Sequence, residues 1–209
     1  MKLADYLTPL PLIAVLRGIT PEEIQGVAEA LTAEGFRVLE VPLNSPRPFE
    51  SIKKLAHDYG QHCLIGAGTV IDPTDVVRVR DARGKLVVMP HGDTEVVREA
   101  KARDLLCVPG VSTPTEAFAG LAAGADGLKM FPAEALPPAA LKAWRAVLPW
   151  ETLVFPVGGI KPESMAPYWA VGASGFGTGS NLYQPGADPK EVRKVAAAYA
   201  AAFRALPPR

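Results

Sequence analysis

Residues 105–116 read Leu-Leu-Cys-Val-Pro-Gly-Val-Ser-Thr-Pro-Thr-Glu and contain the unit from which the chain is built. The apolar run Leu105–Val108 predicts a short buried strand. Thr113 follows with a side chain that can cap a helix, and Pro114 suits the first helical position because no N–H is needed there. The stretch therefore predicts a strand followed closely by a helix.

The same unit recurs along the whole chain. Short apolar runs predict eight strands, at Leu12–Leu16, Val38–Leu43, Cys63–Ala67, Leu86–Met89, Leu105–Val108, Gly127–Phe131, Leu153–Val157 and Ser174–Gly177. A helical pattern follows each run, and a capping side chain with a proline marks further helix starts at Thr20-Pro21, Asp72-Pro73 and Asp188-Pro189. Eight such units predict an α/β chain folded as a closed (β/α)8 TIM barrel, with residues 1–209 in a single domain.

An open doubly wound sheet is the alternative fold. Such a sheet more often carries a G-x-G-x-x-G turn after its first strand. The first strand here runs instead into Arg17-Gly18-Ile19-Thr20, which favours the barrel. At the chain ends we expect a short helix in residues 1–8 that closes the bottom of the barrel. A long closing helix in Pro189–Leu206 should pack on its outside, with a subunit contact as the alternative use.

The composition excludes several classes of partner. Lysine and arginine together number 22, as do aspartate and glutamate, so no net field attracts nucleic acid or an anionic membrane. The apolar stretch Leu10–Leu16 is too short to span a bilayer, and no signal peptide is recognisable. Cys63 and Cys107 lie in apolar runs and are interpreted as small buried hydrophobes rather than disulfide partners or metal ligands. We expect a cytoplasmic protein that binds a small molecule.

Lys129 stands in the apolar run Gly127–Pro132 and is the first candidate for chemistry. Burial disfavours a charged ammonium, so a lysine in such a place can lose its proton near neutral pH and attack a carbonyl. Taken alone, such a lysine would as readily extend its head into water from a strand end.

Other polar residues recur at the carboxyl ends of the predicted strands, where barrels of this kind hold their active sites. Arg17 follows the first strand, Glu40 and Asn44 belong to the second, and Thr69 follows the third. Together with Lys129 they predict a site for a carbonyl compound. Taken singly, Arg17 and Glu40 would also suit a structural ion pair, and Thr69 a helix cap.

Glycine-rich segments follow the last two predicted strands: Gly158-Gly159, and Gly177 to Asn181, which includes Gly179 and Ser180. Backbone N–H groups exposed there, near a helix start, are typical of phosphate sites in barrels. Tight turns are the alternative interpretation of these glycines. No G-x-x-x-x-G-K-[ST] occurs, which argues against a nucleotide P-loop.

The three histidines give no sign of a metal site. His57, His62 and His91 are scattered, and none belongs to H-x-H, H-E-x-x-H or a cysteine cluster. His57 and His62 are expected on the surface. His91 follows the fourth predicted strand and is a lesser candidate for the mouth of the barrel.

The motifs also carry a resemblance. Several stretches, in their order and spacing, resemble the 2-keto-3-deoxy-6-phosphogluconate and -galactonate aldolases over nearly the whole chain: Arg17-Gly18, residues 40–46, residues 66–70, Leu128 to Pro132, and Gly158-Gly159. The resemblance implies a class I aldolase on a (β/α)8 barrel, a homotrimer, and no metal or organic cofactor. It also implies roles for individual residues: Lys129 forms the imine, Glu40 is the acid and base acting through water, Arg17, Thr69 and Asn44 lie at the substrate, and Gly158, Gly159, Gly179 and Ser180 hold the phosphate.

Residues 40–46, Glu-Val-Pro-Leu-Asn-Ser-Pro, are similar to the galactonate branch, because Pro42 and Asn44 stand where the gluconate branch tends to have Thr and Arg. Residues 131–135 are closer to the gluconate branch. The expected reaction is cleavage of 2-dehydro-3-deoxy-6-phosphogalactonate to pyruvate and D-glyceraldehyde 3-phosphate. The alternatives are the gluconate epimer or both epimers as substrate, a phosphosugar isomerase or epimerase, and a noncatalytic phosphometabolite-binding protein.

Overall fold

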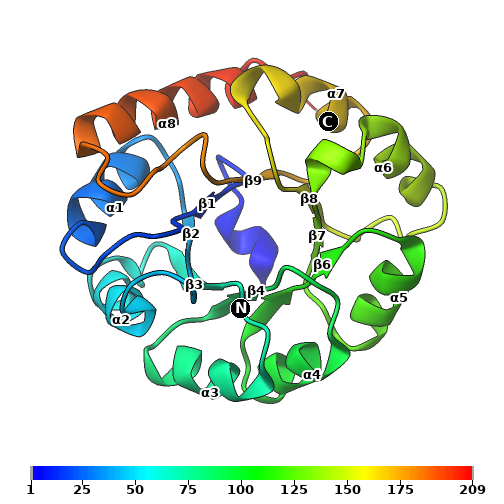
Figure 1. Ribbon diagram of the computed structural model, residues 1–209. Helices are drawn as coiled ribbons and strands as arrows, with labels where there is room; N and C mark the ends of the chain where they lie inside the picture. Colours follow the sequence, from blue (N-terminus) through cyan, green and yellow to red (C-terminus); the bar gives the residue numbers. More distant parts are fainter. Residues whose placement is uncertain (1, 209) are drawn as a thin grey trace.

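The computed structural model describes residues 2–208, in which strands and helices alternate (Figure 1). The strands are β1 (Leu12–Val15), β2 (Val38–Pro42), β3 (Leu64–Gly68), β4 (Leu86–Val88), β5 (Leu106–Val108), β6 (Gly110–Val111), β7 (Leu128–Met130), β8 (Val154–Pro156) and β9 (Phe176–Thr178). The helices are α1 (Ile24–Ala33), α2 (Pro48–Tyr59), α3 (Pro73–Asp81), α4 (Thr94–Ala102), α5 (Pro114–Ala122), α6 (Pro138–Arg145), α7 (Met165–Ala170) and α8 (Pro189–Arg204). Short 3-10 turns occur at η1 (Leu3–Tyr6), η2 (Ala133–Ala135) and η3 (Pro162–Ser164).

The strands form two parallel sheets that curl within a ring of helices (Figure 1). One sheet has the order β5-β4-β3-β2-β1-β9, and the other has the order β6-β7-β8. A parallel bridge between Val157 and Gly177 joins β8 to β9. The architecture is therefore α/β with parallel strands inside and helices outside.

Each of the eight predicted strands overlaps an observed one, but the fifth prediction was incomplete. Leu105–Val108 was expected as one strand, whereas the chain there forms β5 and β6 on either side of Pro109. Proline has no N–H to donate to a ladder. The chain accordingly changes partner at this residue, from β4 on one side to β7 on the other.

Helix starts follow the capping signals in three of the four predicted cases. Asp72 accepts a hydrogen bond from the Thr74 N–H, and Thr113 and Asp188 cap α5 and α8 in the same manner. The prediction at Thr20-Pro21 was wrong in detail, because residues 21–23 form a turn and α1 begins at Ile24.

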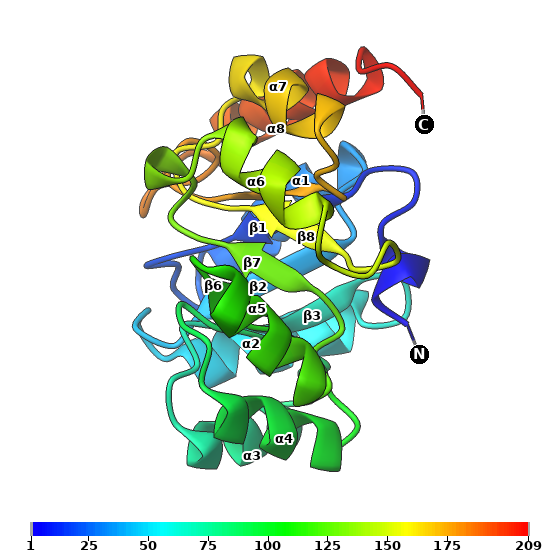
Figure 2. The same cartoon turned by 90° about the vertical axis from the view of Figure 1, so that its right-hand side faces the viewer.

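Apolar residues pack in two layers, one inside the ring of strands and one between the strands and the helices. The inner layer contains Ile13, Val38, Leu64 and Phe155. Leu3 of η1 joins it, as the expectation of a short helix at the barrel bottom requires. η1 and the segment after α8 lie at the same end of the ring (Figure 2).

The outer layer anchors the closing helix. Val192, Ala196, Tyr199 and Ala200 of α8 are buried, and the Tyr199 hydroxyl donates a hydrogen bond to the carbonyl of Ile160 at 2.7 Å. The prediction that this helix packs on the outside of the barrel is confirmed: its buried face lies beside α1 and η3. Within residues 2–208, no helix combines the length and the apolar character that a membrane span requires.

Candidate active site

Lys129 is the middle residue of β7, where alternation along the strand turns it to the inside of the ring while Leu128 and Met130 join the outer layer. The residue is only 5% exposed. Burial lowers the pKa of Lys129 from its ordinary value, Glu40 opposes the change, and Arg17 adds to it. The Nζ atom lies 4.6 Å from the centre of the Phe131 ring. An amine in this position can shed its proton more easily than an exposed lysine and act as a nucleophile.

Glu40 lies on β2, paired with Val15 on one side and Gly66 on the other, and is 1% exposed. Its carboxylate lies against the Cα of Gly68, in space that any other side chain would fill. Among residues 2–208, no group forms a hydrogen bond with its Oε2 atom. Burial raises the pKa of Glu40 to about 7, although Lys129 and Arg17 pull it downward. A carboxyl group with this pKa can both accept and donate a proton near neutrality.

Arg17 contacts two other predicted residues at the carboxyl ends of the strands, Asn44 and Thr69. Its Nη1 donates to Asn44 Oδ1 at 2.7 Å, and its Nη2 donates to Thr69 Oγ1 at 3.4 Å. Thr69 has φ of +54°, which is strained for a β-branched residue and typical of functional sites. The segments that follow β2 and β3 thus fix the guanidinium that follows β1, and this group can bind a substrate carboxylate.

A cavity of ≈ 520 Å³ opens at this end of the ring. The sequence-predicted residues on its wall are Arg17, Lys129, Gly158, Gly159, Gly179 and Ser180. Glu40, Asn44 and Thr69 are not on the wall. The charge of Glu40 raises the pKa of Lys129, and Asn44 and Thr69 accept hydrogen bonds from Arg17.

The wall also includes residues that were not predicted from the sequence, among them Phe131, Glu134, Tyr183 and Gln184. Glu134 covers the Gly158-Gly159 loop, so that a Cβ on Gly159 would lie 2.6 Å from Glu134 Cγ. Gly158 and Gly159 have φ of +107° and +64°, a region that favours glycine. The two glycines therefore provide both the turn and the space for Glu134, and no pattern local to either segment indicates that they meet.

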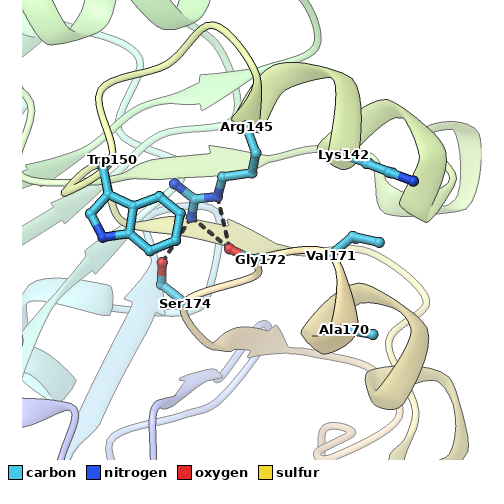
Figure 3. Close-up of a pocket in the computed structure, with 7 residues that line it drawn as sticks. All are labelled: Lys142, Arg145, Trp150, Ala170, Val171, Gly172 and Ser174. Carbon is cyan, nitrogen blue, oxygen red and sulfur yellow. Dashed lines mark hydrogen bonds between the residues drawn. The ribbon is translucent and has the colours of Figure 1, made fainter. Parts of the chain in front are cut away.

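A second cavity, of ≈ 570 Å³, lies beside the amino ends of β8 and β9, between α6 and α7 (Figure 3). Arg145 crosses it and donates hydrogen bonds to the Gly172 carbonyl and to Ser174 Oγ. It also donates to the Thr152 carbonyl at 2.6 Å. Backbone and hydroxyl oxygens thus bind the arginine, which joins the end of α6 to the two loops that precede β8 and β9.

The remaining predictions concern histidine, cysteine and metals. His91 is exposed and does not line the Lys129 cavity, so its proposed place at the mouth is not supported. Cys63 and Cys107 are buried and unpaired, as expected, and burial raises the pKa of Cys107 to about 12. In the described part of the chain, no group of three acidic, histidine or cysteine residues has the arrangement of a metal site.

Comparison with known proteins adds an independent observation. The family described as "Aldolase: KDPG and KHG aldolase" matches residues 3–197. The 2-dehydro-3-deoxy-6-phosphogalactonate aldolase of Escherichia coli K12 is 44% identical over 200 residues, which are 96% of this chain and 98% of the relative.

Two solved structures extend the comparison. One described as "Native KDPGal structure" superimposes with a TM-score of 0.93 at 43% identity, covering 98% of each chain. A KDPG aldolase from Legionella pneumophila, with pyruvate captured as a covalent carbinolamine, gives a TM-score of 0.78 at 30% identity over 94% of this chain and 93% of that one.

Proposed function

The chain belongs to the KDPG and KHG aldolase family, and we propose that within this class I family it cleaves 2-dehydro-3-deoxy-6-phosphogalactonate to pyruvate and D-glyceraldehyde 3-phosphate. The observation that carries the proposal is the buried amine of Lys129, which shares the interior of the ring with the Glu40 carboxyl and lines a cavity with Arg17. Phosphosugar isomerases and epimerases have no use for an imine-forming lysine. A noncatalytic binding protein does not need a buried carboxyl group, such as Glu40, whose pKa of about 7 suits proton transfer.

The reaction begins with the neutral Lys129 amine adding to the C2 ketone of the sugar acid. Loss of water from the carbinolamine leaves a protonated imine that can accept an electron pair. Glu40 removes the C4 hydroxyl proton, the C3–C4 bond breaks, and its electrons form the enamine of pyruvate while the aldehyde phosphate departs. Protonation at C3 and hydrolysis of the imine then release pyruvate and restore the amine.

A water molecule carries the proton between Glu40 and the substrate in this proposal. Glu40 is buried and does not line the cavity. A water molecule is therefore needed to connect its carboxyl group with the C4 hydroxyl. Because one group takes a proton and later returns it, the pKa of about 7 suits both steps.

Arg17 binds the substrate carboxylate, with Asn44 and Thr69 fixing its guanidinium. Gly158, Gly159, Gly179 and Ser180 bind the phosphate through backbone N–H groups and the serine hydroxyl. Lys129 and these loops line one cavity, as binding of a ligand that carries both a reactive carbonyl and a phosphate requires.

The fold and assembly belong to the same proposal. β5 and β6 are separated by Pro109 alone, and Val157 pairs with Gly177, so we take the nine strands as eight positions of one closed (β/α)8 barrel in a single domain of residues 1–209. We also propose a cytoplasmic homotrimer that needs no metal or organic cofactor. Light scattering on a size-exclusion column tests the trimer, and chelator tests the metal independence.

The substrate is tested by comparing the two C4 epimers, 2-dehydro-3-deoxy-6-phosphogalactonate and its gluconate counterpart, in an assay that couples pyruvate release to NADH oxidation by lactate dehydrogenase. We expect a higher kcat/KM for the galactonate epimer. Equal values would assign the chain to both substrates, and a higher value for the gluconate epimer would contradict the proposal.

A further inference from the structure

The segment of residues 179–187, between β9 and α8, forms a strap along one side of the Lys129 cavity. Gly179, Ser180, Tyr183, Gln184 and Pro185 of the strap line the cavity wall. The strap thus carries one of the two proposed phosphate loops, and whatever fixes its position also fixes that loop.

Glu23, at the start of α1, holds the strap through its carboxylate. The Gly186 N–H donates to Glu23 Oε1 at 2.6 Å, and the Thr20 N–H donates to Oε2 at 2.9 Å. Burial alone would raise the pKa of Glu23, but these N–H donors outweigh it and hold the pKa below its ordinary value. The side chain is therefore a carboxylate near neutral pH, and charge-assisted hydrogen bonds of this kind are among the strong ones.

A second contact joins the same two segments. Pro185 of the strap packs on Gly18, where a Cβ would lie 2.6 Å from the proline Cγ. Gly18 has φ of +81°, and its N–H donates to Ser45 Oγ at 2.9 Å. The residue directly after Arg17 is consequently in contact with the strap, so the carboxylate end and the phosphate end of the cavity are tied together.

Tyr183, in the middle of the strap, is buried. It is 3% exposed, and its hydroxyl lies near the Glu23 carboxylate. Burial, and then the charge of Glu23, raise the pKa of Tyr183. Apart from the Glu23 contacts, few backbone bonds hold the strap: the N–H groups of Leu182 and Tyr183 donate to the Gly179 carbonyl, and the Ala187 N–H donates to the Gln184 carbonyl. The Asn181 side chain also donates to the Ile160 carbonyl at 3.3 Å.

We propose that Glu23 is a positioning residue that holds the strap, and with it Gly179 and Ser180, in the geometry that binds the substrate phosphate. The inference rests on the proposed function. Glu23 does not line the cavity and touches no reacting atom. Its effect should therefore appear in the affinity for phosphate and not in imine formation at Lys129.

The test compares Glu23→Gln with the matched control Glu22→Gln, in which the neighbouring exposed carboxylate pairs with Arg47 instead. For Glu23→Gln we expect KM for the sugar acid phosphate and the inhibition constant of inorganic phosphate to rise about tenfold, the effect of losing one charge-assisted hydrogen bond. We expect kcat to stay within about twofold and borohydride trapping of pyruvate, which has no phosphate, to be unchanged. Glu22→Gln should match the wild type throughout.

Two outcomes would overturn the proposal: unchanged phosphate inhibition in Glu23→Gln, or equal losses of phosphate binding and pyruvate trapping. If Glu23→Gln does not fold, Glu23→Asp keeps the charge but shortens the reach to Gly186, and an intermediate rise of KM is expected. A wild-type protein that traps no pyruvate would remove the proposed function alone, because phosphate binding measured calorimetrically still reports on the strap.

Discussion

Replacement of Glu40 by glutamine should change how stability depends on pH. Burial gives the wild-type carboxyl a pKa of about 7, against an ordinary value of 4.5. The raised pKa means that the folded protein favours the neutral acid. The stability that this group contributes is fully present below pH 4.5 and is lost as the pH rises through 7.

The magnitude follows from the difference between the two pKa values. A difference of about 2.5, at about 1.4 kcal/mol for each pKa unit, corresponds to about 3 kcal/mol of unfolding free energy. Glutamine cannot ionise, so it does not lose this stability. The free energy of unfolding of Glu40→Gln relative to wild type should rise by about 3 kcal/mol between pH 4.5 and pH 8.

Urea unfolding of both proteins at pH 4.5, 6 and 8, at one protein concentration, measures this change. Comparing the pH dependence removes the constant effect of a buried amide, and Glu163→Gln, at an exposed residue, controls for loss of a carboxylate. A relative stability that is constant within about 1 kcal/mol, or that falls with pH, would refute a raised pKa for Glu40. The same variant should slow turnover by about 10²- to 10⁴-fold, because proton transfer loses its acid and base.

Three further substitutions test the geometry of the site. Gly68→Ala places a methyl group where the Glu40 carboxylate lies. We expect kcat to fall at least tenfold, while thermal unfolding still shows a cooperative transition. An unchanged kcat would contradict this packing of Glu40 against Gly68. Arg17→Gln removes the guanidinium that Asn44 fixes and should raise KM by about 10- to 100-fold. A decrease of kcat alone would contradict a role in substrate binding and indicate a role in the chemical step. Glu134→Gln removes a negative charge beside the Gly158-Gly159 loop and should lower the inhibition constant of inorganic phosphate severalfold, a result that an increase of this constant would exclude.

The sequence was sufficient for those features that depend on local pattern. The hydrophobic pattern located every strand except β6, and the capping signals located three of the four helix starts that they marked, because a buried run such as Val38–Leu43 and a cap such as Asp72 act within a few residues. The split of the fifth strand at Pro109 was missed, although proline is a local signal, because the change of partner from β4 to β7 depends on the curvature of the whole ring.

The candidate site was predictable where the strand ends converge and not where loops meet. Lys129, Glu40 and Arg17 lie on or beside strands, and parallel strands bring their carboxyl ends together. Glu134 lies in η2 and Glu23 at the start of α1, and their partners Gly159 and Gly186 are 25 and 163 residues away in the sequence. Contacts of this kind follow from the packed fold, and no spacing in a single sequence encodes them.

The most direct test of the account is borohydride reduction in the presence of pyruvate, followed by peptide mass mapping. We expect a single label on Lys129, no label in Lys129→Met, and no effect of chelator, because an imine on a buried amine needs no metal. The exposed Lys161, beside the Gly158-Gly159 loop, should remain unlabelled. A folded wild-type protein that is not labelled, or one that is labelled at Lys161 instead, would contradict the assignment of Lys129 as the imine-forming residue.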